Sequence, residues 1–185
     1  MPAGDEPMTD LSKCVFGKVT KIFDGDTFSF EVLRQGENLD FPGIEGLIRI
    51  RIACIDTPET KQGAIAHQAK NMLTRLVSDH NNHLWIEPSG KSHDRIVAWV
   101  FGKNPHEEHI TDLGKVLVLT GQAKVLYNHL NDYPNKWESY IKAQAEAQLK
   151  RRGIWSKDCI EPDTFKILQR LWRCEDLLKE HRIEF

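Results

Sequence analysis

The sequence predicts an α+β protein: a five-stranded OB-type barrel with about three packed helices and an extra helix at its C-terminal end. Two observations support this prediction. Five short segments alternate apolar with polar residues, as half-buried strands do. A stretch with helical spacing separates the third segment from the fourth, and five strands with a helix at that position follow the order of an OB-type barrel. A length of 185 residues suits one domain with a sizeable core.

The strands and helices follow from local patterns. Alternation predicts strands at residues 15–23, 26–33, 48–52, 84–87 and 95–101. An Asp24-Gly25 turn makes a hairpin of the first two strands, and Pro88-Ser89-Gly90 predicts a turn after the fourth. Apolar residues at helical spacing predict helices at 64–78, 113–120 and 137–152, with Gly153 as the C-terminal cap of the last.

The third strand leads directly into a group of oxygen donors. Pro58 has no N–H for a sheet and holds Thr57 extended, so strand pairing should stop there and leave the Thr57 carbonyl free. Asp56 and Glu59 flank that carbonyl, and Asp26 in the hairpin would join them if the two strands are neighbours. Clustered hard oxygens are ligands for Ca²⁺, whereas zinc would need His or Cys.

Strict alternation conflicts with this site in one respect. It places Asp56 on the face of Ile48, Ile50 and Ile52, and Arg51 on the opposite face. A bulge or coil between Arg51 and Asp56 is therefore expected if both are to reach one ligand.

Several motifs together resemble the staphylococcal nuclease (thermonuclease) family over roughly residues 15–156. These are Asp24-Gly25-Asp26-Thr27, an arginine (Arg51) five residues before Asp56-Thr57-Pro58-Glu59-Thr60, Arg95 at the head of a strand, and Gly153-Ile154-Trp155-Ser156. The resemblance implies an OB-fold, calcium-dependent nuclease that hydrolyses DNA and RNA with little sequence specificity and leaves 3′-phosphates. Ser92-His93-Asp94-Arg95 departs from the family's usual pattern, because a lysine and a tyrosine are missing before the arginine.

The resemblance also assigns the site residues. The metal site would comprise Asp26, Asp56, Thr57 and Glu59, with Glu59 as general base. Arg51 and Arg95 would hold the phosphate and stabilise its charge. The expected substrate-binding residues are Tyr127, which would stack on a nucleobase, together with His129 and Lys124.

The sequence also predicts the domain organisation, the cellular location and the state of the cysteines. We expect a flexible tail at 1–13, the nuclease-like domain at 14–156 and a helical extension packed on it at 157–185. No apolar run has membrane-spanning length, and the polar start lacks the features of a signal peptide, so we expect no membrane association and a cytoplasmic protein, or a secreted one if a leader was removed. The four cysteines have no CxxC spacing and are expected to be reduced.

Substrate and oligomeric state follow less directly. We expect a monomer that prefers single-stranded DNA and RNA, with salt-sensitive binding because the net charge is −2. The alternative is a nucleic-acid-binding OB module with an inactive site. The complete set of Asp26, Arg51, Asp56, Glu59 and Arg95 favours the enzyme, because a module that only binds needs no such set.

Overall fold

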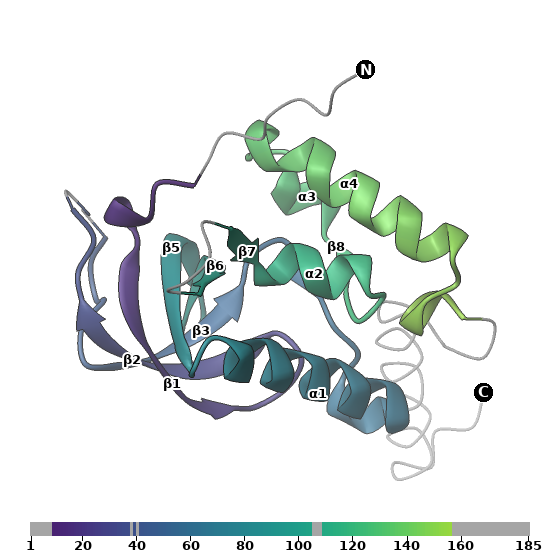
Figure 1. The fold of residues 1–185 in the computed structure, drawn as a ribbon, viewed down its shortest axis with the longest axis horizontal. Helices are drawn as coiled ribbons and strands as arrows, with labels where there is room; N and C mark the ends of the chain where they lie inside the picture. Colours follow the sequence, from purple (N-terminus) through teal and green to yellow (C-terminus); the bar gives the residue numbers. More distant parts are fainter. Residues whose placement is uncertain (1–8, 38, 40, 105–108, 157–185) are drawn as a thin grey trace, which may run out of the picture.

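A computed structural model describes residues 9–37, 39, 41–104 and 109–156. Its long strands are β1 (Val15–Ile22), β2 (Thr27–Arg34), β3 (Leu47–Ile52), β5 (His83–Ser92) and β6 (Arg95–Lys103), and its short strands are β4 (Ile55–Asp56), β7 (Ile110–Asp112) and β8 (Lys124–Val125). The helices are α1 (Ala64–Asp79), α2 (Leu113–Leu119), α3 (Tyr127–Leu130) and α4 (Pro134–Leu149) (Figure 1). None of these helices is both long enough and apolar enough to span a bilayer.

The five long strands close into a barrel, which confirms the predicted fold class. Four antiparallel pairings give the order β3-β2-β1-β5-β6. Parallel pairing of β3 with β6, with Ile50 opposite Ile96 and Ile52 opposite Ala98, joins the two ends of that order. Closure leaves the barrel without an edge between these two strands. It also brings the end of β3 beside the start of β6, and this is where the predicted site residues lie.

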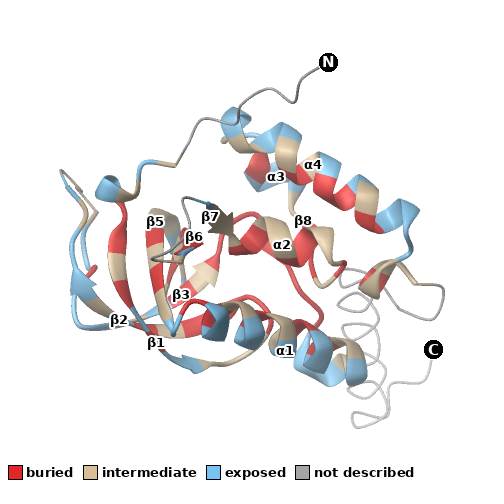
Figure 2. Ribbon diagram, viewed as in Figure 1, coloured by how far each residue is buried: buried red, intermediate tan, exposed pale blue. Residues whose placement is uncertain are grey.

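The barrel interior is filled by the inward-facing residues of the alternating strands. Phe28, Phe30, Ile50, Leu84 and Ile86 have no exposed surface. Figure 2 shows the same alternation as red bands across the sheet and as a red stripe along α1. The stripe consists of Ala66, Ala69, Leu73 and Val77, so the buried face of α1 is rotated slightly from the predicted face that included Ile65 and Met72.

Three helices pack beside the barrel, as predicted. Helix α2 lies between α1 and α4 (Figure 1). A buried polar cluster ties α4 to the start of α2: Tyr140 donates a 2.8 Å hydrogen bond to Asp112, and Lys136 Nζ lies 3.8 Å from the same carboxylate. Asp112 also caps α2 by accepting from Lys115 N at 3.1 Å. The cluster positions the helical layer on the strands, because β7 ends at Asp112.

The structure corrects three of the predicted boundaries. Pro88-Ser89-Gly90 is not a turn but an irregularity inside β5, and the hairpin turns instead at His93-Asp94, where His93 has a φ of 57°. Helix α4 begins at Pro134, three residues before its predicted start, because proline suits the first position of a helix. Gly153 does not cap α4, which ends at Leu149, but opens a 3₁₀ helix, Gly153–Trp155.

The two ends of the chain differ in what is described. Leu11–Lys13, assigned by the sequence to the flexible tail, form a 3₁₀ turn capped by Asp10, and Leu11 packs against the core. The predicted C-terminal helical extension lies outside the described residues. Of the cysteines, Cys14 and Cys54 are described, and both are buried free thiols.

Candidate active site

A break in the chain after β3 sets the geometry of the site. Strand β3 ends at Ile52 and β4 begins at Ile55, and between them Cys54 has a positive φ of 57°. Such a conformation interrupts the alternation of side chains. As a result, Nη2 of Arg51 lies 3.2 Å from Oδ1 of Asp56. The conflict raised by strict alternation is resolved by the expected coil.

The Asp24-Gly25-Asp26 turn is held against this break. Ile52 N donates to the Asp26 carbonyl at 2.9 Å, and Asp26 N donates to Asp24 Oδ1 at 3.1 Å. The turn packs so closely that a Cβ on Gly25 would lie 2.8 Å from Ala69 Cβ and 3.0 Å from Thr57 Cβ. Only glycine therefore allows the turn to lie between α1 and Thr57.

The four charged or hydroxyl groups around Arg51 form one network. Arg51 Nη2 lies 3.6 Å from Asp26 Oδ2 as well as 3.2 Å from Asp56. Thr27 donates a 2.7 Å hydrogen bond to Asp26 Oδ1, and Arg95 Nη1 donates to Thr27 Oγ1 at 3.4 Å. The two arginines thus approach Asp26 from two strands of the barrel, β3 and β6.

Burial makes the charged forms of the carboxylates in this network costly, because water no longer solvates them. Asp26 and Asp56 are 5% and 3% exposed. Burial raises the pKa of the Asp26 carboxyl above its usual value, and the charge of Arg51 opposes this only in part. The charge of Arg51 therefore does not fully offset the cost of burying the Asp26 carboxylate.

Glu59 lies at the exposed rim of the site. It caps the 3₁₀ turn Thr60–Gln62 in a capping box, in which Glu59 N donates to Gln62 Oε1 at 2.7 Å and the Glu59 side chain accepts from Gln62 N. This reciprocal bonding holds the carboxylate at one place. The capping box leaves Glu59 in the wall of the cleft.

These residues line one cleft of about 180 Å³. Its walls contain all six residues expected at the metal and the phosphate, Asp26, Arg51, Asp56, Thr57, Glu59 and Arg95. Asp24, which sequence reasoning treated only as part of a turn, also lines it. Its position two residues before Asp26 is the signal that could have identified it. Among the described residues, no three His, Cys, Asp or Glu side chains form a ready-made metal site.

The predicted substrate-binding residues lie outside this cleft. Tyr127, His129 and Lys124 line a separate cavity of about 490 Å³. Tyr127 is 50% exposed and its hydroxyl accepts a 2.6 Å hydrogen bond from Gln144 Nε2, whereas Lys124 is buried and its backbone pairs with Asp56. A third cavity of about 470 Å³ is lined by both Arg51 and His129 and so lies between the two.

The model of the staphylococcal nuclease homologue family matches residues 49–157 of the sequence. The chain belongs to this family. The matched span of the nuclease begins at Arg49, so it contains Arg51, Asp56, Glu59 and Arg95, whereas Asp26 comes before it. The protein is also similar to one named as a probable endonuclease in Schizosaccharomyces pombe, with 27% identity over 174 residues that cover 83% of this chain and 75% of the relative. It is therefore a nuclease, a hydrolase of phosphodiester bonds.

Proposed function

We propose that this nuclease is calcium-dependent, that it cuts single-stranded DNA and RNA internally with little sequence specificity, and that it leaves 3′-phosphates. One observation carries the proposal: the cleft of about 180 Å³ brings two arginines, two buried aspartates and an exposed glutamate to one place from separate parts of the chain. A module that only binds nucleic acid has no need for that combination.

The charge of the cleft is the argument for a divalent cation. Four carboxylates line it, from Asp24, Asp26, Asp56 and Glu59, against two guanidinium groups, which leaves two formal negative charges. A phosphodiester is itself an anion and would be repelled. Asp26, Asp56 and the Thr57 carbonyl offer hard oxygens of the kind that Ca²⁺ prefers over zinc. Bound there, Ca²⁺ would supply Lewis-acid stabilisation of a phosphate oxygen.

The two arginines bind and stabilise the phosphate in this proposal. Each guanidinium offers paired N–H donors to phosphate oxygens, and the charge on those oxygens grows as the five-coordinate phosphorus forms. Arg51 is already oriented by Asp26 and Asp56, and Arg95 by Thr27. Neither arginine gives up a proton in the working pH range, so both act as electrostatic groups.

Glu59 acts as the general base. Its carboxylate faces the cleft and is held by the capping box. It takes a proton from the attacking water as the water oxygen bonds to phosphorus. The P–O5′ bond then breaks: the leaving 5′-oxygen takes up a proton from solvent to become a hydroxyl, and the phosphate stays on the 3′-oxygen of the upstream nucleotide.

The cavities beside the cleft support binding of an unpaired strand. Arg51 lines both the cleft and the 470 Å³ cavity, and His129 lines both that cavity and the 490 Å³ cavity of Tyr127. An aromatic ring that stacks on bases accepts any sequence, because every base has a π face. Bases can reach such a ring when they are not paired, which favours single strands.

The test is cleavage of a single-stranded DNA and an RNA of mixed sequence in calcium and in chelator. We expect calcium-dependent cleavage, a loss of about 10²–10⁴-fold in Glu59→Gln, and products whose 3′ ends are sensitive to phosphatase. Thermal melts provide a readout independent of turnover: calcium should raise the Tm of the wild type and not that of Asp26→Asn/Asp56→Asn. Binding without cleavage by the wild type in any divalent ion would instead indicate an inactive module.

A further inference from the structure

A group of two cations and one aromatic ring lies on the outer surface of the barrel, next to the cleft. We call Lys21, Phe23 and Arg49 the basic platform. Arg49 Cζ lies 4.6 Å from the centroid of the Phe23 ring, and Lys21 Nζ lies 5.0 Å from it. Both cations are exposed, and the ring holds each at a defined position through cation–π attraction.

Strand register places the basic platform directly beside the catalytic residues. Lys21 pairs with Ser29, and Ser29 pairs with Arg49, so the two cations lie in one row across β1, β2 and β3, and Phe23 follows directly after β1. The next row on the same face of β2 and β3 is Thr27 with Arg51, two residues further along each strand. Arg49 and Arg51 therefore point to one face of β3, about 7 Å apart along the strand.

A cavity of about 370 Å³ adjoins the basic platform. Arg49 and Asp94 form part of its wall, and its apolar part comes from Leu47, Ile48 and Ile96. Leu47 is 68% exposed, so its side chain is accessible to a ligand in this cavity. The cavity and the cleft are neighbours, because Asp94 lines one and Arg95 lines the other.

These positions follow β3 in order. The 370 Å³ cavity lies beside Leu47 to Arg49, the catalytic cleft follows at Arg51, and the 470 Å³ cavity extends from Arg51 to Ile55. The cleft thus has a hollow on each side. A strand that passes through it can continue in both directions, as internal cleavage requires.

From this arrangement we infer that the basic platform and its cavity form a second nucleotide position, on the side of the cleft away from Tyr127. Lys21 and Arg49 bind the phosphate next to the scissile one, and Leu47 provides an apolar surface for the sugar or base. This inference rests on the proposed function. Since the whole chain carries a net charge of −2, binding of a polyanion depends on such local cations.

The ion pair of Arg49 with Asp94 does not prevent this role. Nη1 of Arg49 lies 3.1 Å from Asp94 Oδ2, but the side chains are 43% and 70% exposed. An exposed pair contributes little, because water and salt screen it, so a phosphate can replace the carboxylate. Asp94 therefore competes with substrate at the platform. Removal of its charge should strengthen substrate binding, whereas removal of Lys21 and Arg49 should weaken it.

The test compares two substrates: a dinucleotide with a single phosphodiester bond, and a longer single strand of mixed sequence. In Lys21→Gln/Arg49→Gln we expect unchanged kcat/KM on the dinucleotide. On the long strand kcat/KM should fall about tenfold, the effect of one lost charge-assisted contact. The slope of log affinity against log salt should fall by about 0.7, the value of one phosphate on a single strand. Asp94→Asn should strengthen binding of the long strand.

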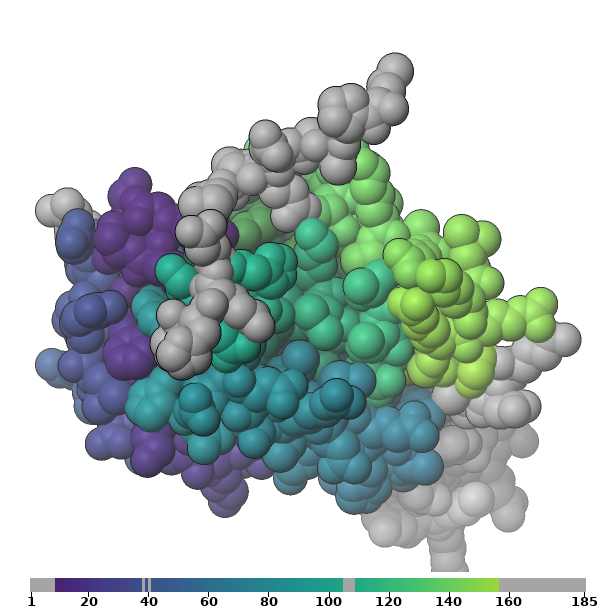
Figure 3. Space-filling view, in the orientation of Figure 1, coloured from purple at the N-terminus to yellow at the C-terminus, as the bar shows by residue number. Residues whose placement is uncertain are grey.

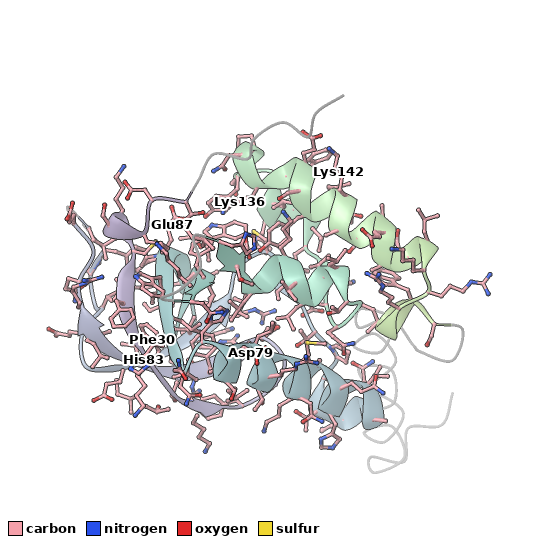
Figure 4. The ribbon with its side chains drawn as sticks, in the orientation of Figure 1. Phe30, Asp79, His83, Glu87, Lys136 and Lys142 are labelled. Carbon is pink, nitrogen blue, oxygen red and sulfur yellow. The ribbon has the colours of Figure 1, made fainter. Side chains whose placement is uncertain are left out.

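The matched control is Lys142→Gln. Lys142 is an exposed lysine on α4, ion-paired with Glu138, and lies away from the first strands of the barrel (Figure 4). In the space-filling view the purple surface of those strands and the yellow-green end of α4 are at opposite ends of the molecule (Figure 3). Lys142→Gln should leave kcat/KM unchanged on both substrates, because the charge it removes is distant from the platform.

Two outcomes would overturn the inference. Equal losses on both substrates would place Lys21 and Arg49 in the catalytic step, and no loss on the long strand would show that they do not contact it. If the wild type cleaves neither substrate, the proposed function fails instead. Fluorescence anisotropy of the long strand with Glu59→Gln, with and without the platform substitutions, still measures how much the platform contributes to binding.

Discussion

The guanidinium of Arg51 holds the carboxylate of Asp56 across a break in the chain, with Nη2 3.2 Å from Oδ1. The same nitrogen lies 3.6 Å from Asp26 Oδ2. One arginine thus connects two buried carboxylates, one from the turn before β2 and one from β4. Because all three groups line the cleft, the pairing that connects these segments also fixes the geometry of the cleft wall.

Removal of Arg51 should therefore weaken the fold as well as the activity. In Arg51→Ala, Asp26 and Asp56 would remain buried without this counter-charge, and breaking a buried pair costs about 3 kcal/mol. Urea unfolding measures the loss. Calcium should restore part of it by binding the two carboxylates. A stability loss that calcium leaves unchanged would contradict the proposed metal site, and Arg51→Lys is the control that keeps the charge but not the paired donors.

Substitutions of Glu59 and Gln62 distinguish the chemical role of the Glu59 carboxylate from the effect of holding it in place. Glu59→Gln keeps an acceptor for the capping box but has no basic carboxylate, so we expect activity to fall by orders of magnitude at nearly unchanged Tm. Gln62→Ala removes the acceptor for Glu59 N, whose bond is 2.7 Å long. It should reduce kcat by only a few-fold, because the base remains but is held less firmly. Equal losses of kcat in the two variants would argue against Glu59 as the base.

The packing of the Gly25 turn can be tested with a matched pair of glycines. A Cβ at Gly25 would lie 2.8 Å from Ala69 Cβ, so Gly25→Ala should destabilise the protein by about 1–3 kcal/mol and lower activity by displacing Asp26. A Cβ at Gly90 would meet nothing within 4 Å. Gly90→Ala should leave both Tm and activity nearly unchanged. A Gly25→Ala protein with wild-type Tm and activity would show that the turn moves freely.

Tyr127 gives a prediction for substrate binding. Its hydroxyl is bonded to Gln144 at 2.6 Å, which holds the half-exposed ring at the mouth of its cavity. If the ring stacks on a base, Tyr127→Ala should weaken binding of a single strand by about 1–3 kcal/mol. Tyr127→Phe should keep most of the affinity, because the π face remains. Anisotropy titrations distinguish this result from equal effects of both substitutions, which would assign the role to the hydroxyl.

Asp112 predicts a pH dependence of stability. Burial raises the pKa of this carboxyl in the folded protein, and the charge of Lys136 opposes the rise only in part. A raised folded pKa means that its contribution to stability is greatest below the unfolded pKa of about 3.9 and is lost as pH rises through the folded value. The wild type should therefore gain stability relative to Asp112→Asn as pH falls from about 7 toward 4. Urea unfolding at several pH values measures the difference, and a constant difference would contradict the shift.

Several features of the fold could be read from the sequence because they depend on local patterns. Alternation predicted strands at 15–23, 26–33 and 48–52, within one residue of β1, β2 and β3, and helical spacing predicted α1. Boundaries set by tertiary contacts were missed. Pro88 and Gly90 read as a turn, yet β5 continues through them because β6 pairs along both sides of the irregularity. Gly153 has to be a glycine because the turn at Gly121 lies against it: a Cβ at residue 153 would clash with the Gly121 carbonyl oxygen.

The sequence by itself determined which residues to expect in one cleft, since Asp26, Arg51, Asp56, Thr57, Glu59 and Arg95 follow a spacing that local chemistry and the family pattern both favour, and all six line it. Only the tertiary structure decided how they meet. The turn at Cys54 rotates Asp56 toward Arg51, and barrel closure brings Arg95 to Asp26 through Thr27. Antiparallel pairing of β1, β2 and β3 places Lys21 and Arg49 in one row beside the cleft. The physical reason is that side-chain direction depends on backbone conformation at single residues and on pairing between distant strands, neither of which a linear pattern records.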